Sequence, residues 1–294
     1  RVFGPELVVG ELLAGTEGLE RLVLALHDRE GRTVEQLIRM MDVLLLTSGR
    51  EPVGAALRAL VTGRIAELVG EAAAHPGTRL GDVLDTALAR FAADPGPAAI
   101  VSAGVPMPRR GVGLGLRALN VTLADLAVRH RRAHGDLVAL AMALTWSSSA
   151  LAGVGRLGEA VAAATEAVEI YAGAPPYEAA AGRADAFFGL AACLLLAGEG
   201  AAALRPAQEA AARFRILAEE DPRYRGEAAR AHHNLACALL EAGRVGEAVA
   251  AFEAAGGDPD FATHVTDVLS VLAPDVPSFS GVESSGAGGA EVVV

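Results

Sequence analysis

The chain has 294 residues, of which 52% are hydrophobic and only 4% aromatic, and it carries a formal net charge of −11 at pH 7. Strands favour β-branched and aromatic side chains whereas Ala and Leu favour helices, so the 63 alanines exclude a β-rich fold and predict an all-α one. All 25 basic residues are Arg, which excludes functions that need a lysine, such as Schiff-base catalysis or a phosphate-binding P-loop.

Three further features of the composition concern the protein's surroundings. Two cysteines indicate no disulfide framework, so we expect a reducing, cytoplasmic location. The first residue is Arg1 rather than Met, so we expect the sequence to be a portion of a longer chain. Residues 136–294 carry 21 acidic and 9 basic side chains. Because this charge repels phosphate backbones, we expect no nucleic-acid partner.

Helical periodicity runs through the first 91 residues. Thr33 and Gln36 have the spacing of a capping box, and apolar residues then recur at helical intervals until Ser48. Pro52 lies at the start of a long helix, and a Pro-Gly pair follows its end. The expected helices are roughly 6–13, 17–28, 34–48, 52–74 and 80–91.

Helix breakers cluster over residues 94–113, where Pro and Gly are frequent. We therefore expect residues 1–113 to form a helical region, with atypical helical repeats as one form of it. A short helix is expected at 98–103 inside this junction, and a connecting helix over 114–136. At the other end of the chain, the sequence predicts a capping helix at 261–272 and a disordered tail over 274–294.

A repeat begins at residue 137. Gly155, Gly198 and Gly243 are spaced by 43 and then 45 residues, and each separates two helical stretches. Because Gly adopts a positive φ without strain, each of these three units is predicted to be a helical hairpin with Gly in its turn.

The three units resemble the tetratricopeptide repeat, which places apolar and small residues before the hairpin turn and Ala and Phe after it. The third unit matches best, with Leu235 before Gly243 and with Ala248 and Phe252 after it. The spacing exceeds the family's usual value of about 34 residues, and the family's Trp and Tyr are missing. With the capping helix, the resemblance covers residues 137–273.

This resemblance implies a right-handed α-α superhelix, in which the first helices of successive hairpins line a concave groove. It also implies that a polypeptide partner binds in the groove without any chemistry. The residues placed on the groove are Thr145, Ser149, Asp185, Phe188, Arg230, His233 and Asn234. Asn and Arg can hydrogen-bond a peptide's backbone or carboxylates, whereas ordinary solvated surface is the alternative for these positions.

Two pairs of residues could suggest metal ligands. His130 and His134 share a helix face, but the neighbouring arginines would repel a cation. Cys193 and Cys237 occupy adjacent places in successive units, but their separation is not a zinc spacing and both are expected in the core. We therefore expect no metal and no cofactor.

Catalysis and membrane insertion are also disfavoured. The Gly-rich run 111–115 follows no predicted strand, and the serines at 147–149 lie within a predicted helix, so neither indicates a phosphate cradle or a nucleophile. Residues 137–155 are uncharged, but Trp146 and these serines interrupt the apolar run, and we expect a packed helix rather than a membrane span.

These features predict a protein-binding module, part of a larger bacterial protein, rather than an enzyme. An enzyme with a site of scattered acids and His is kept as an alternative from another class. The runs 12–46 and 53–74 also resemble the helical segments of bacterial signal-transducing ATPases that carry tetratricopeptide sensors. Under that alternative, the chain is the regulatory arm of such an ATPase, whose nucleotide-binding domain lies elsewhere.

Overall fold

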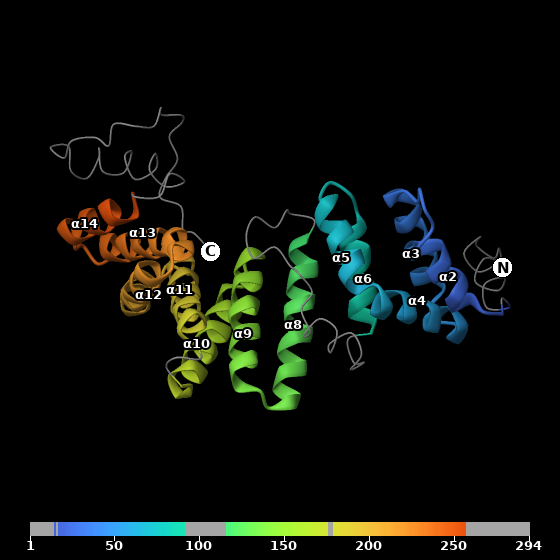
Figure 1. Ribbon diagram of the computed structural model, residues 1–294, viewed down its shortest axis with the longest axis horizontal. Helices are drawn as coiled ribbons and strands as arrows, with labels where there is room; N and C mark the ends of the chain where they lie inside the picture. Colours follow the sequence, from blue (N-terminus) through green and yellow to red (C-terminus); the bar gives the residue numbers. More distant parts are fainter. Residues whose placement is uncertain (1–14, 16, 92–115, 176–178, 257–294) are drawn as a thin grey trace. The chain divides into compact units, whose positions relative to one another are not determined.

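The computed structural model describes residues 15, 17–91, 116–175 and 179–256. These residues are 84% helical, contain no strand and form twelve α-helices that pack in neighbouring pairs (Figure 1). The expected all-α class is therefore confirmed. The chain divides into two compact units, residues 1–135 and residues 136–294, and each is described by itself.

The first unit has a core built mainly from leucines. Its helices are α2 (Leu19–His27), α3 (Val34–Thr47), α4 (Glu51–Gly63), α5 (Ile65–Ala74), α6 (Leu80–Arg90) and α8 (Arg117–His134). Helix α4 packs on α2 and α3, and α6 packs on α3, α5 and α8. Leu37, Leu57, Leu60 and Leu84 are fully buried between these helices.

The predicted start of α3 is confirmed at the level of single hydrogen bonds. The backbone N–H of Gln36 donates to Thr33 Oγ1 at 3.2 Å, and the backbone N–H of Thr33 donates to Gln36 Oε1 at 3.0 Å. These two bonds satisfy donors that would otherwise be left without partners at the helix N-terminus.

The single helix predicted over 52–74 is wrong, because the structure divides it into α4 and α5. The break lies at Arg64, whose φ of −131° and ψ of 19° leave the helical region. Gly63 precedes it and weakens the helix locally. The side chain of Arg64 pairs with Asp28, which lies 36 positions earlier and is invisible to local periodicity.

The described part of the second unit, up to residue 256, consists of three helical hairpins. Its elements are α9 (Leu137–Gly153), α10 (Leu157–Gly173), α11 (Ala180–Leu196), α12 (Gly200–Glu220), a short 3₁₀ helix (Pro222–Tyr224), α13 (Arg225–Glu241) and α14 (Val245–Ala255). The turns inside the pairs contain Gly155, Gly198 and Gly243 at φ of 78°, 75° and 71°. The predicted hairpins and the role of their glycines are confirmed.

Alanines line the contacts inside these hairpins, so the paired helices approach closely. Ala160, Ala164, Ala203 and Ala207 are all buried. Larger side chains fill the spaces towards the helix ends, and the three largest that are fully buried are Tyr171, Phe214 and Phe252. Tyr171 and Phe214 occupy the same place in the first two hairpins, whereas Phe252 stands in the third where the others have Ala164 and Ala207.

The uncharged run over residues 137–155 forms helix α9 and the start of the turn that follows it. Among the helices the structure describes, none combines the length and the apolar character needed to cross a membrane. The expected helices at 6–13, 98–103 and 261–272 and the expected tail over 274–294 lie outside the described residues.

Candidate functional site

The seven residues predicted for partner binding lie on α9, α11 and α13, the first helices of the three hairpins. Helix α11 contacts both α9 and α13, so the three helices are neighbours in sequence order. The repeat spacing makes Thr145, Phe188 and His233 equivalent positions, and likewise Asp185 and Arg230. The predicted set therefore spans all three hairpins.

On α9, both predicted residues are half-buried hydroxyls. Thr145 Oγ1 donates to the carbonyl of Ala141 at 2.9 Å, and Ser149 Oγ donates to the carbonyl of Thr145 at 3.4 Å. Each hydroxyl oxygen keeps lone pairs that can accept a hydrogen bond from a ligand N–H.

Helices α11 and α13 contribute one aromatic and two charged side chains. Phe188 is half-buried, and its ring meets Phe214 edge to face with 6.4 Å between centroids. Asp185 is also half-buried. Arg230 donates to Glu227 Oε1 at 3.0 Å, and the two side chains are 14% and 26% exposed. These two helices thus offer an apolar ring, an acidic side chain and a basic one.

The last two predicted residues lie in the interior. His233 and Asn234 are each 1% exposed. The His233 ring packs edge to face on Phe252 at 5.5 Å, and its Nε2 lies 3.7 Å from Cys237 Sγ. Both residues therefore contribute to packing, and the accessible part of the predicted set is Thr145, Ser149, Asp185, Phe188 and Arg230.

A groove that the sequence did not predict lies across α12, α13 and α14. It encloses about 340 Å³ and is lined by Gln208, His232, Leu235, Leu239, Glu247 and three alanines of α14. The alanines at 250, 251 and 254 leave this space. Small side chains on one helix face are the sequence pattern from which this groove could have been predicted.

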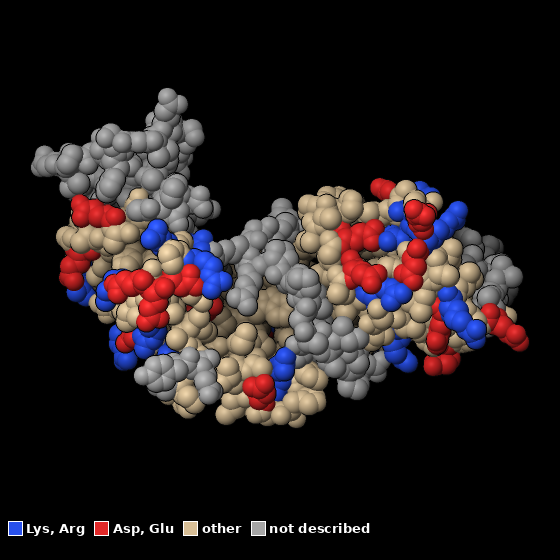
Figure 2. Space-filling view, viewed as in Figure 1, with Lys and Arg blue, Asp and Glu red and all other residues tan. Residues whose placement is uncertain are grey.

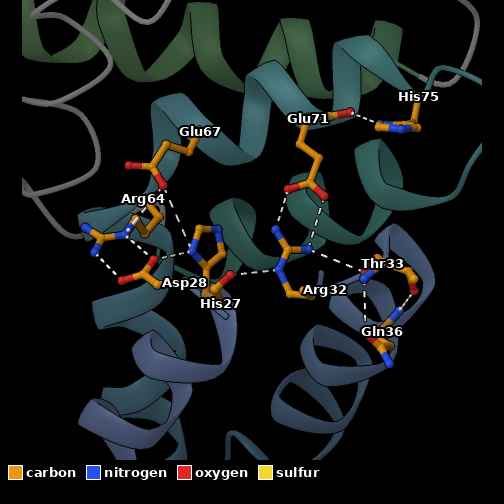
Figure 3. A network of polar contacts seen from close by, with 9 residues as sticks. All are labelled: His27, Asp28, Arg32, Thr33, Gln36, Arg64, Glu67, Glu71 and His75. Atoms are coloured by element: carbon orange, nitrogen blue, oxygen red, sulfur yellow. Dashed lines mark hydrogen bonds and ion pairs between the residues drawn. The ribbon is translucent and has the colours of Figure 1, made fainter. Parts of the chain in front are cut away.

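The sequence also did not predict a cluster of charged residues in the first unit. Arg64 donates to both carboxylate oxygens of Asp28 at 3.0 and 2.7 Å, and His27 Nδ1 lies 2.8 Å from Asp28 Oδ1 (Figure 3). Arg64 and His27 together hold the pKa of Asp28 well below its ordinary value. Arg32 and Glu71 form a second, bidentate pair beside it, at 3.1 and 2.7 Å.

Within this cluster, ligand atoms of His27, Asp28 and Glu67 lie within 4.8 Å of one another. That set could in principle hold a metal ion. However, the Arg64 guanidinium pairs with both carboxylates, at 2.7 Å from Asp28 and 3.5 Å from Glu67. A cation would have to displace this positive charge, so the geometry is that of an ion-pair cluster.

The residues weighed as metal ligands from the sequence have other environments. The rings of His130 and His134 stack at 4.0 Å, and burial together with His134 and Arg131 lowers the pKa of His130. Cys193 and Cys237 are buried free thiols, and burial is the main cause that raises the pKa of each to about 11. Neither thiol is prepared to act as a nucleophile.

Comparison of the chain with models of known protein families and with curated proteins found no match.

Proposed function

We propose that this chain is a polypeptide-binding module whose second unit is a tetratricopeptide-like, right-handed stack of helical hairpins. The observation that carries the proposal is the repetition of one hairpin three times in register. Each hairpin turns at a left-handed glycine, and the first helices of the second and third hairpins, α11 and α13, pack on the hairpin before them. Stacks of this kind present one continuous face to a ligand.

The contacts between hairpins support a groove on the first-helix side. Helix α11 contacts α9 and α13, whereas no comparable contact joins α10 to α12, or α12 to α14, in the described part of the chain. First helices that lie closer together than second helices place the first helices on the inner side of a curve. A concave face of this kind suits an extended or helical peptide.

The chemistry of the accessible residues favours a peptide. Hydroxyls of Thr145 and Ser149 can accept backbone N–H groups, Phe188 can contact an apolar side chain, and Asp185 and Arg230 can pair with opposite charges. In the described part of each unit, acidic and basic side chains are interspersed on the visible face, without a broad basic patch (Figure 2). That pattern does not suit a phosphate backbone.

The test is a peptide-display selection against the full chain, followed by calorimetry with the selected peptide. We expect Phe188→Ala and Asp185→Asn each to weaken binding about tenfold or more, as for residues that carry binding energy. Arg215→Gln on α12 is the matched control, since this side chain is 59% exposed on a second helix. Equal loss in the control, or no loss in the α11 variants, would refute the proposal.

A further inference from the structure

The break between α4 and α5 is a candidate hinge in the first unit. One residue, Arg64, ends α4 and begins α5. Beyond the break, α5 buries Ile65, Leu68 and Val69 to an exposure of 1% or less. A change of backbone angles at one position could therefore move α5 as a rigid piece and uncover an apolar helix face.

Charged side chains join α5 to the turn between α2 and α3. Glu71 lies one helical turn beyond Glu67 on α5, and its two oxygens accept from both terminal nitrogens of Arg32 at 3.1 and 2.7 Å. The two side chains are only 14% and 20% exposed. Nε of Arg32 also donates to the carbonyl of His27 at 2.8 Å, so the guanidinium bridges α5 and the end of α2.

The hinge residue itself belongs to the same cluster. Arg64 holds Asp28 through two hydrogen bonds and lies 3.5 Å from Glu67. His27, with a side chain that is 4% exposed, lies 2.8 Å from Asp28 and 4.0 Å from Glu67. Figure 3 shows these side chains of the α2–α3 turn and of α5 converging.

We propose that this cluster is an ionic latch that holds α5 closed about the Arg64 hinge. The backbone of α5 packs on α4 and α6, while ion pairs join α5 to the end of α2 and to the α2–α3 turn. Loss of the Arg32–Glu71 pair removes one of these contacts and leaves the apolar packing unchanged. Opening then exposes Ile65, Leu68 and Val69 to solvent, independently of the groove proposed in the second unit.

Native-state hydrogen exchange on the full chain tests this proposal. In Arg32→Gln, we expect the amides of residues 69–74 to exchange at least about tenfold faster, as for loss of one charge-assisted pair. The protection of α3 should stay within about threefold of the parent chain. Reversing the pair, with Arg32→Glu and Glu71→Arg together, should restore slow exchange in α5.

The matched control is Arg79→Gln, which removes a pair with Asp42 at 3.3 Å in the same unit, from a side chain that is 69% exposed. It should leave exchange in α5 unchanged. If Arg32→Gln does not fold, Glu71→Gln takes its place in the experiment. If amide exchange became equally faster in all helices from α2 to α6, the Arg32–Glu71 pair would stabilise the whole unit rather than α5. If the exchange rates in α5 did not change, apolar packing alone would hold α5 in place. Either result overturns the latch.

Discussion

Gly182 is a residue at which one hairpin of the second unit lies tightly against the preceding one. A Cβ built on Gly182 would lie 2.3 Å from the hydroxyl of Tyr171 and 2.8 Å from its ring. Tyr171 is 1% exposed, so its side chain lies inside the packed unit. Next to it, Arg183 donates to the carbonyls of Tyr171 and Ala174 at the end of α10.

We therefore expect Gly182→Ala to lower the free energy of unfolding by about 1–3 kcal/mol, the usual cost of overpacking. Urea denaturation measures the change. Gly158→Ala is the control, because a Cβ there meets nothing within 4 Å. It should be neutral or stabilise by about 0.4–1 kcal/mol. Equal stability of the two variants would contradict the tight contact.

Both thiols should be slow to react in the folded protein. With the pKa of Cys193 and Cys237 raised to about 11, only about one molecule in a thousand carries a thiolate at pH 8. We expect iodoacetamide to label them far more slowly in buffer than in denaturant, as followed by mass spectrometry. Native labelling at the rate of an open thiol would contradict their burial.

At the scale of the helix, the contribution of the Thr33 cap to the free energy of unfolding can be measured. Thr33→Ala removes the acceptor of the Gln36 N–H and should lower the free energy of unfolding by about 1 kcal/mol. Thr86→Ala is the control, because Thr86 is exposed inside α6 and its hydroxyl bonds only the carbonyl of Asp82. It should change stability by no more than about 0.5 kcal/mol. Urea denaturation of both variants checks this, and an equal effect would refute a specific cap.

The helices that could be predicted are those whose signals are local. The Thr33 cap and the glycine turns depend on residues within a few positions, so the sequence places α3 and the three hairpins correctly. The break at Arg64 follows a single Gly63 inside a stripe of apolar residues that continues through it, and periodicity therefore missed it. Arg64 also pairs with Asp28, a partner 36 positions away that local patterns do not reveal.

For the candidate site, too, the sequence could predict only what local patterns determine. Repeat register placed its residues on the first helices of the three hairpins, which are α9, α11 and α13, because the register follows from the glycine spacing. It could not separate Phe188, which is half-buried, from the equivalent His233, which is buried against Phe252. That difference arises from the side chains of neighbouring helices, which the register does not specify.

For the whole molecule, ion pairs predict how stability depends on pH. Among the residues that the structure describes, four carboxyls have pKa values lowered by hydrogen bonds to arginine. The pairs are Asp28 with Arg64, Glu159 with Arg156, Asp221 with Arg223, and Glu247 with Arg244. A lowered pKa in the folded state means that the stabilisation is present above the unfolded value of about 4 and is lost as the pH falls below it.

We therefore expect the free energy of unfolding, measured with urea, to stay level between about pH 7 and 5 and to fall between about pH 5 and 2. Salt at about 0.5 M should reduce this fall, because all four pairs are open to solvent and are screened. Stability that is constant or rises on acidification from pH 5 to 3 would contradict the assigned pairs.

Contacts between neighbouring hairpins also have a mechanical consequence. The first and third hairpins of the second unit share no substantial contact in the described residues, so each is held by the next one along the chain. Under a stretching force, such a unit should yield in separate steps rather than in one event. A repeat of 43–45 residues, counted from one turn glycine to the next, would release about 15 nm of chain, which optical tweezers resolve.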